Sequence, residues 1–317
     1  MNLLDLELHA VRVPMRLRFR GVRWREALLI RGPEGWGEFS PFPDYGPEST
    51  CRWLAAALEA ACANWPDPRR DRIEVNVTVP AVDPETAFSL VAESGCSTAK
   101  VKVGEPGQTL DDDLARVAAV RRAVGAAGKV RIDANAAWQL DQAEVYLNRL
   151  DSHDLEFVEQ PVATVAEMVE LRKRVRVPIA ADEAVRLASD PMEIVEAGGA
   201  DLLVLKVQPL AGVARALDVA NRSGLPVVVS SALETSVGIA AGLALAAALD
   251  ELPYACGLGT VALMAGDVCL DPLIPDGGSI VVRRPEPDPD LLETWAADRE
   301  TESRLLRRFR EAAEMLT

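Results

Sequence analysis

From residue 73 onward the chain repeats one pattern, in which a short run rich in β-branched and aliphatic residues precedes a stretch with helical periodicity or many alanines. This alternation is typical of βα units, in which helices connect the parallel strands of one sheet. We expect seven strands and a weaker eighth, at residues 73–79, 97–103, 129–134, 155–160, 177–182, 200–206, 225–231 and 254–259. Eight such units predict a (β/α)8 TIM-type barrel, an α/β fold, in residues 71–274.

The first 70 residues have a different character. Two alternating runs, 3–13 and 24–31, precede a Gly- and Pro-rich segment and a helical segment at 51–65. These features predict a small α+β capping domain in residues 1–70. We expect the C-terminal segment 275–317 to contribute to it, although the charged tail from residue 291 could be either a helix or frayed.

Composition excludes several classes of protein. A net charge of −15 over 317 residues argues against a nucleic-acid surface, which needs basic patches. Five scattered cysteines without a C-x-x-C pair suggest neither a disulfide framework nor a zinc site. No uninterrupted apolar stretch reaches the length of a membrane span, so we expect a cytoplasmic protein with no membrane or nucleic-acid partner. The sequence does not indicate an oligomeric state.

Charged residues end four consecutive predicted strands, namely Asp133, Glu159, Asp182 and Lys206. The spacings between them are 26, 23 and 24 residues, each about the length of one βα unit. Because the carboxyl ends of parallel strands meet at one face of a barrel, these side chains should converge there. Active sites of this fold lie at that face.

Three carboxylates at one face require a cation, because neighbouring like charges would otherwise force protonation. Oxygen ligands favour a hard ion, so we expect Mg²⁺, with Mn²⁺ possible, on Asp133, Glu159 and Asp182. The alternative is that each carboxylate caps the helix that follows it. For three consecutive strands the metal site is the favoured interpretation.

Lys100 and Lys102 occupy alternate positions of "AKVKVG", so both side chains point to the same face of the strand. Lysines on an exposed edge strand are the simple alternative. Lys102 and Lys206, however, lie four strands apart with the carboxylate strands between them, which places them on opposite sides of a closed barrel. A small-molecule carboxylate substrate held between them would have a lysine on each side of its α-carbon, as general acid–base catalysis requires.

Five motifs in this order resemble the enolase superfamily, in its muconate-lactonizing-enzyme subgroup. They are the Lys-x-Lys of "AKVKVG", then "DANAAW", "VEQP", "ADEA" and "LKVQPLAG". The resemblance implies that Asp133, Glu159 and Asp182 are the metal ligands and that Lys102 and Lys206 are the acid–base pair. It also implies that residues 34–50, "EGWGEFSPFPDYGPEST", cover the substrate, and that the family's loop near residue 20 is short here, at 18–26.

Two further segments resemble the o-succinylbenzoate synthases of menaquinone biosynthesis, namely "SSALETSVGIAAG" at 230–242 and "GLGT" at 257–260. The Asp-x-Asp usual in dipeptide epimerases of the subgroup is replaced by residues 257–259, Gly-Leu-Gly. The resemblance implies a Mg²⁺-dependent syn dehydration of 2-succinyl-6-hydroxy-2,4-cyclohexadiene-1-carboxylate through an enediolate. The alternatives are an N-acylamino-acid racemase or cycloisomerase, and a barrel that binds carboxylates without turning them over.

Four residues near the motifs have expected supporting roles. Lys100, expected to be charged, and Arg131, on the strand of Asp133, are expected to contact the substrate carboxylate. Asn135 and Glu183 follow metal ligands and either orient those ligands or cap helices.

Four residues of the seventh and eighth units complete the candidate site. Ser230 and Ser231 either donate hydrogen bonds to a substrate carboxylate or begin the next helix. Gly259 and Thr260 either leave room for that carboxylate and donate backbone N–H groups to it or simply form a turn.

Overall fold

The computed structural model describes residues 6–19 and 21–316. Within these residues the main sheet has seven parallel strands, whose spatial order follows the chain order from β5 to β11. Their bounds are β5 (Val77–Val79), β6 (Thr98–Lys102), β7 (Lys129–Asp133), β8 (Leu155–Glu159), β9 (Ile179–Ala181), β10 (Leu202–Leu205) and β11 (Val227–Val229). The TIM-type architecture predicted from the βα rhythm is confirmed, with the corrections below.

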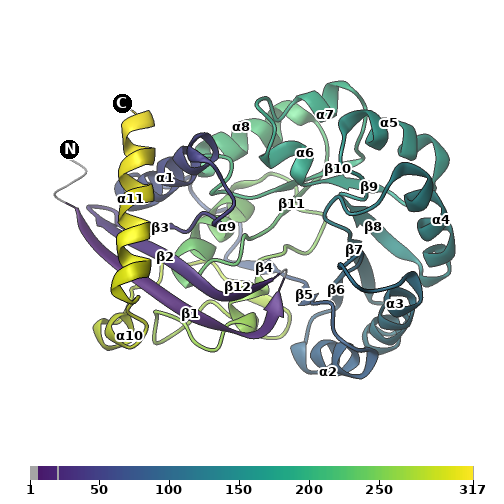
Figure 1. The fold of residues 1–317 in the computed structure, drawn as a ribbon, viewed down its shortest axis with the longest axis horizontal. Helices are drawn as coiled ribbons and strands as arrows, with labels where there is room; N and C mark the ends of the chain where they lie inside the picture. The colour runs from purple at the N-terminus through teal and green to yellow at the C-terminus, as the bar shows by residue number, and fades with distance from the viewer. Residues whose placement is uncertain (1–5, 20, 317) are drawn as a thin grey trace.

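Helices surround the outside of this curled sheet (Figure 1). They are α2 (Pro84–Ser94), α3 (Leu110–Val124), α4 (Leu140–Leu150), α5 (Val165–Arg174), α6 (Glu183–Arg186), α7 (Glu193–Glu196), α8 (Val213–Ser223) and α9 (Ser236–Ala248), with a 3₁₀ turn η2 (Asp151–His153) after α4. Local sequence explains several of the helix starts. Thr109 and Thr164 each form a capping box with the acidic side chain three residues later, which satisfies free N–H groups of the first turn.

The eighth predicted strand, 254–259, is not a regular strand. Cys256 forms a single bridge with Val75 and Gly257 a single bridge with Ser230, so these two residues close the barrel between its first and last strands. The backbones approach closely here, because a Cβ atom on Gly257 would lie 2.4 Å from Ser230 Oγ. A 3₁₀ turn, η3 (Gly259–Leu263), follows immediately and ends the extended conformation.

The first predicted strand, 73–79, is divided in two. Residues Arg72–Glu74 form β4, which pairs antiparallel with β12 (Ser279–Val281), and only β5 belongs to the main sheet. The long β-rich run therefore serves two sheets, a change of partner that its composition does not reveal.

The N-terminal region forms an antiparallel sheet of β1 (Glu7–Phe19), β2 (Val22–Gly32) and β3 (Gly35–Phe39), with helix α1 (Pro47–Cys62) packed against it. The charged tail is helical, in α10 (Pro289–Thr294) and α11 (Arg299–Leu316). Figure 1 shows α11 lying along β1, β2 and α1, so the end of the chain returns to its N-terminal sheet. An α+β unit beside the barrel is thus confirmed, while the division at residues 70 and 274 stays a prediction.

Two apolar layers support the barrel. A cluster that includes Phe157, Leu202 and Val204 fills its interior, and a larger cluster lies between the sheet and the outer helices. The five cysteines are free thiols. Among the described residues, no helix combines the length and the apolar character needed to cross a membrane.

Candidate active site

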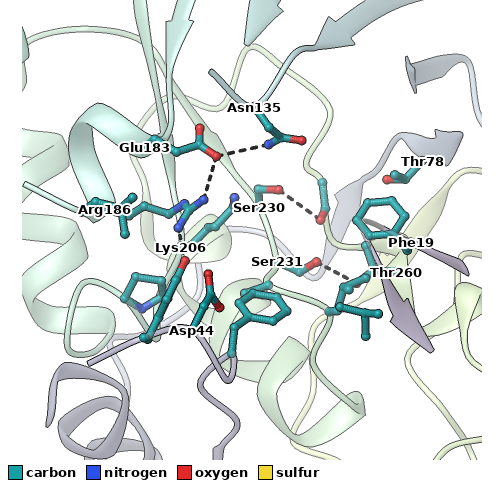
Figure 2. Close-up of a pocket in the computed structure, with 18 of the residues that line it drawn as sticks. Phe19, Asp44, Thr78, Asn135, Glu183, Arg186, Lys206, Ser230, Ser231 and Thr260 are labelled. Carbon is teal, nitrogen blue, oxygen red and sulfur yellow. Dashed lines mark hydrogen bonds and ion pairs between the residues drawn. The ribbon is translucent and has the colours of Figure 1, made fainter. Parts of the chain in front are cut away.

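A cavity of about 410 Å³ lies at the carboxyl ends of the barrel strands, within the size range of small-molecule sites. Figure 2 shows side chains from the barrel and from the N-terminal unit around it. The barrel contributes Thr78, Lys100, Lys102, Asn135, Glu183, Arg186, Leu187, Lys206, Pro209, Ser230, Ser231, Ala232, Leu233, Gly257 and Thr260. The N-terminal unit contributes Phe19, Val22, Phe42, Pro43, Asp44, Tyr45 and Trp53.

The register of the parallel strands brings the predicted residues together. Lys102 lies opposite Asp133 on the neighbouring strand, and Asp133 lies opposite Glu159 on the next. All three side chains are buried, and Glu159 is only 1% exposed. The sequence spacing of one βα unit therefore becomes a row of adjacent strand ends.

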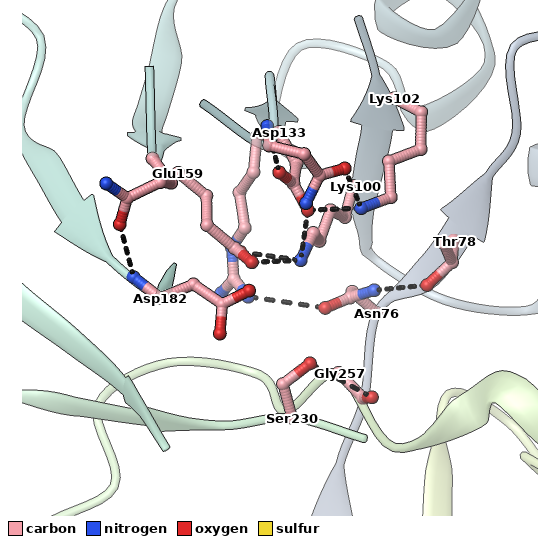
Figure 3. A network of polar contacts seen from close by, with 12 residues as sticks. Asn76, Thr78, Lys100, Lys102, Asp133, Glu159, Asp182, Ser230 and Gly257 are labelled. Carbon is pink, nitrogen blue, oxygen red and sulfur yellow. Dashed lines mark hydrogen bonds and ion pairs between the residues drawn. The ribbon is translucent and has the colours of Figure 1, made fainter. Parts of the chain in front are cut away.

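The lysines bind the carboxylates directly, and Figure 3 shows this for Lys100 and Lys102. Lys100 Nζ lies 2.9 Å from Asp133 Oδ2 and 2.6 Å from Glu159 Oε2. Lys206 Nζ lies 2.6 Å from Asp182 Oδ2. Lys102 Nζ donates to Asp133 and, at 2.8 Å, to Asn135 Oδ1. Lys100, Lys102, Asp133 and Glu159 thus form one network, and hydrogen bonds through Asn135, Glu183 and Arg186 connect it to the pair of Lys206 and Asp182.

Burial and mutual charge alter the pKa values of these groups in opposite directions. Burial and the nearby Asp133 charge raise the pKa of Glu159 to about 7, despite the opposing effect of Lys100. Burial also raises the pKa of Asp133, but Lys100 and Lys102 outweigh it and hold that pKa well below its usual value. Lys100 itself loses stabilisation of its charge through burial, yet the three carboxylates raise its pKa above the ordinary value. The site therefore holds Lys100 as a cation.

The surroundings of Lys102 are unusual in two ways. The ring of Phe19, at the end of β1, lies 5.3 Å from its ammonium nitrogen. Asn135, its hydrogen-bond acceptor, has a φ of 45°, a left-handed conformation that non-glycine residues seldom adopt. Such strain gathers at functional sites, because the surrounding structure must enforce it.

Comparison with known proteins identifies the family. An Enolase C-terminal domain-like model matches residues 84–287, and an Enolase N-terminal domain-like model matches residues 10–61. The chain is 60% identical to the o-succinylbenzoate synthase of Thermobifida fusca over 87% of each chain. It is 52% identical to that of Mycobacterium marinum, over 93% of this chain and 90% of the relative. This chain belongs to the o-succinylbenzoate synthase family of the enolase superfamily.

Solved structures of the superfamily show the same fold at low sequence identity. The muconate lactonizing enzyme of Pseudomonas fluorescens superposes with a TM-score of 0.80 at 20% identity, over 92% of this chain and 98% of that one. The L-Ala-D/L-Glu epimerase of Bacillus subtilis superposes with a TM-score of 0.76 at 24% identity, over 90% and 98%.

The donor set of this family member fits a hard metal ion. Members of the superfamily use Mg²⁺, which supports a divalent metal here. In the described part of the chain, no three His, Cys, Asp or Glu side chains are arranged to hold a metal ion. The lysines form ion pairs with the three carboxylates. The candidate ligands nevertheless offer only carboxylate oxygens on adjacent strands, and the ammonium of Lys100 bridges two of them as a cation. This chemistry suits Mg²⁺ or Mn²⁺.

The predicted residues of the last two units lie partly in the cavity wall. Ser230, Ser231 and Thr260 line it, and the hydroxyls of Ser231 and Thr260 lie 2.7 Å apart and share a hydrogen bond (Figure 2). Gly257 lines the cavity, whereas Gly259 begins η3 beside Pro275.

Arg131 lies deeper in the barrel than predicted. It donates to Glu156 Oε2 at 2.5 Å and to the Ala255 carbonyl at 2.7 Å, and its guanidinium stacks over the ring of Phe157 at 4.6 Å. Because it precedes Asp133 by two residues, it occupies the layer of the barrel interior below the carboxylates. It does not belong to the cavity lining, so the contacts favour a structural role over contact with substrate.

Glu183 and Asn135, which the motifs predict to orient ligands or cap helices, bond each other. Asn135 Nδ2 donates to Glu183 Oε1 at 3.2 Å, and Glu183 also accepts from Arg186 at 2.7 Å. These bonds connect Lys102, through Asn135, to the residues that follow Asp182.

Sequence reasoning missed Arg186 and Gln160. Arg186 donates to Asp182 Oδ1 at 3.0 Å and to the hydroxyl of Tyr45 from the N-terminal unit. Gln160, with a φ of 38°, accepts hydrogen bonds at 3.1 Å from the backbone N–H groups of Asp182 and Ala184. A signal existed for Arg186, since it lies one helical turn after Asp182, within reach of its carboxylate.

Proposed function

We propose that this chain is an o-succinylbenzoate synthase, a lyase that removes water from 2-succinyl-6-hydroxy-2,4-cyclohexadiene-1-carboxylate in menaquinone biosynthesis. The observation that carries this proposal is the 60% identity to an o-succinylbenzoate synthase over most of both chains. The geometry agrees with it, because Lys100, Lys102 and Lys206 line one cavity and form ion pairs with the three buried carboxylates.

Asp133, Glu159 and Asp182 would hold the metal ion, which we propose is Mg²⁺, with Mn²⁺ as a substitute. When bound, the ion would supply positive charge for the carboxylate of the substrate. Gln160 fixes the backbone of Asp182, and Arg186 and Lys206 each bind one of its carboxylate oxygens, so the position of this ligand is set before a metal binds.

Lys102 would remove the proton from the α-carbon of the substrate. The electron pair of the broken C–H bond then forms an enediolate. When that electron pair forms the new double bond of the ring, the C–O bond breaks, hydroxide leaves and the ring becomes aromatic. In a syn elimination the proton and the hydroxyl leave on the same side, so Lys102 can pass its proton to the departing oxygen and release water. Asn135, at 2.8 Å from Lys102 Nζ, keeps this side chain in place through both transfers.

Lys206 would remain charged on the opposite side. It follows β10, and β7, β8 and β9 separate that strand from β6, which carries Lys102. Its ammonium, held by Asp182, would stabilise the negative charge that develops on the substrate. Ser231 and Thr260 offer hydroxyls in the cavity wall for the second carboxylate.

The comparisons do not favour the alternatives. The relatives at 52–60% identity are named o-succinylbenzoate synthases, rather than racemases or cycloisomerases. A barrel that only binds carboxylates has no need of two lysines on opposite sides of the cavity. The expected cytoplasmic location and the absence of a nucleic-acid partner stay predictions.

The test is an ultraviolet assay of the cyclohexadiene substrate with purified protein, first stripped with EDTA and then supplied with Mg²⁺ or Mn²⁺. We expect o-succinylbenzoate only when metal is present. Asp133→Asn, Glu159→Gln and Asp182→Asn should each abolish turnover while circular dichroism stays that of the wild type. Full activity of the stripped protein would contradict the metal assignment, and faster turnover of an N-acylamino acid would favour the racemase.

A further inference from the structure

The loop of residues 40–45 is neither helix nor strand, yet it forms much of the N-terminal wall of the cavity. Phe42, Pro43, Asp44 and Tyr45 all line that cavity. One turn-like hydrogen bond, from Tyr45 N to the Phe42 carbonyl at 3.2 Å, joins the loop to itself. Other elements must therefore fix its conformation.

Arg308, on the C-terminal helix α11, holds the middle and the end of the loop, while Arg25 and Gln208 hold Ser40 at its start. Its guanidinium donates to the carbonyls of Pro41 at 3.0 Å, Phe42 at 2.9 Å and Tyr45 at 3.0 Å. It also donates to Thr50 Oγ1, at 3.2 Å, in the first turn of α1. A planar fork of five N–H donors can satisfy acceptors in several directions at once, which the single nitrogen of a lysine cannot.

The helix that carries Arg308 is itself held firmly. Phe309 is buried and meets the ring of Phe39 edge-on, with centroids 6.2 Å apart. Arg304, one turn earlier, bonds Glu26 of β2 at 2.6 Å. The guanidinium thus acts from a fixed base nearly 270 residues away in sequence from the loop.

The backbone that Arg308 holds determines where two aromatic side chains lie. Phe42 and Tyr45 meet edge-on, with centroids 5.8 Å apart, and both meet Trp53 in the same way. Arg25 stacks over Phe42 at 4.6 Å and donates to the Ser40 carbonyl. These contacts give the cavity an aromatic wall whose position depends on three loop carbonyls.

We propose that Arg308 is a positioning residue for substrate binding: from the C-terminal helix, it holds the loop of residues 40–45 in the conformation that closes the cavity. This inference rests on the proposed function for its kinetic consequence. The hydrogen bonds from Arg308 to the loop, which we call the Arg308 clamp, are nevertheless present in the protein without substrate. It therefore predicts an ordered loop before substrate binds, rather than one that becomes ordered on binding.

The test combines steady-state kinetics with hydrogen–deuterium exchange of the peptide covering residues 40–50, in the wild type and in Arg308→Met. We expect faster exchange of this peptide in the variant without ligand. We also expect KM to rise about tenfold with kcat within about twofold, as when only about a tenth of the molecules hold the competent loop. Arg307→Met, an exposed change on the same helix, is the matched control and should match the wild type in both measurements.

Arg308→Lys should give intermediate values, and it carries the same comparison if the methionine variant does not fold. Added guanidinium at millimolar concentration should lower the KM of Arg308→Ala, whereas the same concentration of ammonium should not. Unchanged loop exchange and KM in the folded variants would overturn the proposal. So would a lower kcat together with a lower thermal stability if KM did not change. If the wild type failed to dehydrate the substrate, the proposed function would fail, while the exchange measurement would still test the clamp.

Discussion

The two walls of the cavity are held by different means. On the barrel wall, Lys102, Asp133 and Glu159 lie on neighbouring strands, and the hydrogen-bond ladder of the sheet fixes their positions. On the N-terminal wall, the loop of residues 40–45 belongs to no sheet, and guanidinium groups from β2, α6 and α11 hold it.

This difference separates chemistry from substrate retention. The backbone of a strand residue moves only if the sheet moves, so the barrel wall keeps the attachment points of its reacting groups in fixed geometry. The loop of the N-terminal wall, which we call the loop wall, depends on single side chains from distant parts of the chain. Each of these side chains can be removed without disturbing a sheet. We therefore expect changes in the barrel wall to lower kcat and changes in the loop wall to raise KM.

The largest effects should come from the two lysines. Lys102→Ala should lower kcat by about 10³-fold to 10⁴-fold, because it removes the proposed base, and should stop α-proton exchange on an analogue that lacks the hydroxyl. Lys206→Arg keeps a positive charge and should retain partial activity, whereas Lys102→Arg should retain none, since a guanidinium is no base near neutral pH. Steady-state kinetics and deuterium exchange followed by NMR measure both.

Lys129→Arg, an exposed change at the start of β7, is the control for these variants and should have wild-type activity. An active Lys102→Arg with an inactive Lys206→Arg would exchange the two roles. Activity in both arginine variants would exclude a lysine base.

The barrel wall could be predicted from the sequence because its geometry follows from the length of the βα repeat and the number of repeats. Residues spaced by one βα unit lie at the same end of adjacent strands. The spacing of Asp133, Glu159 and Asp182 was therefore sufficient to predict that they lie close together. The eighth strand could not be predicted correctly, because closure here uses single bridges at Cys256 and Gly257. A strand pattern does not show how many residues will find a partner.

The loop wall could not be predicted in the same way. "SPFPDY" shows a turn-rich segment, and the family resemblance places it over the substrate, but neither says what holds it. The Arg308 hydrogen bonds join residues far apart in sequence, and a guanidinium on an amphipathic helix is usually solvated. Arg131 shows the converse, since its strand position suggested the cavity while its actual partners lie in the barrel interior.

The contact between β3 of the N-terminal unit and helix α9 of the barrel should appear in the pH dependence of the free energy of unfolding. Glu38, on β3, accepts hydrogen bonds from Thr235 N at 3.0 Å and Gly238 N at 3.1 Å, at the start of α9. Burial and the nearby Glu234 raise the pKa of Glu38 from 4.5 to about 7, although Arg25 opposes them. The folded protein then holds the proton more tightly than the unfolded chain, so the free energy of unfolding should fall as the pH rises from about 4.5 to about 7.

Glu38→Gln should remove this contribution, which amounts to about 3 kcal/mol across the window. Urea denaturation at pH 5, 6, 7 and 8 gives the free energy of unfolding of each protein. The contribution of Glu38 is the difference between the decreases of the two free energies with pH. Glu34→Gln, on the exposed turn before β3, should leave the decrease unchanged. Parallel curves for wild type and Glu38→Gln would show that the carboxyl of Glu38 is ionised throughout this range.

The smallest effect should come from Tyr45→Phe. This change removes the hydroxyl that accepts a hydrogen bond from Arg186 but keeps the ring that meets Phe42 and Trp53. A hydrogen bond of about 1 kcal/mol predicts a rise in KM of about fivefold with kcat unchanged, because the loop binds substrate without touching the reacting atoms. Tyr146→Phe makes the same chemical change on helix α4, where the hydroxyl accepts from Gln142 at 2.8 Å, and should alter neither constant. If Tyr45→Phe lowered kcat instead, the hydrogen bond would act through Arg186 on Asp182, and the loop would belong with the barrel wall rather than apart from it.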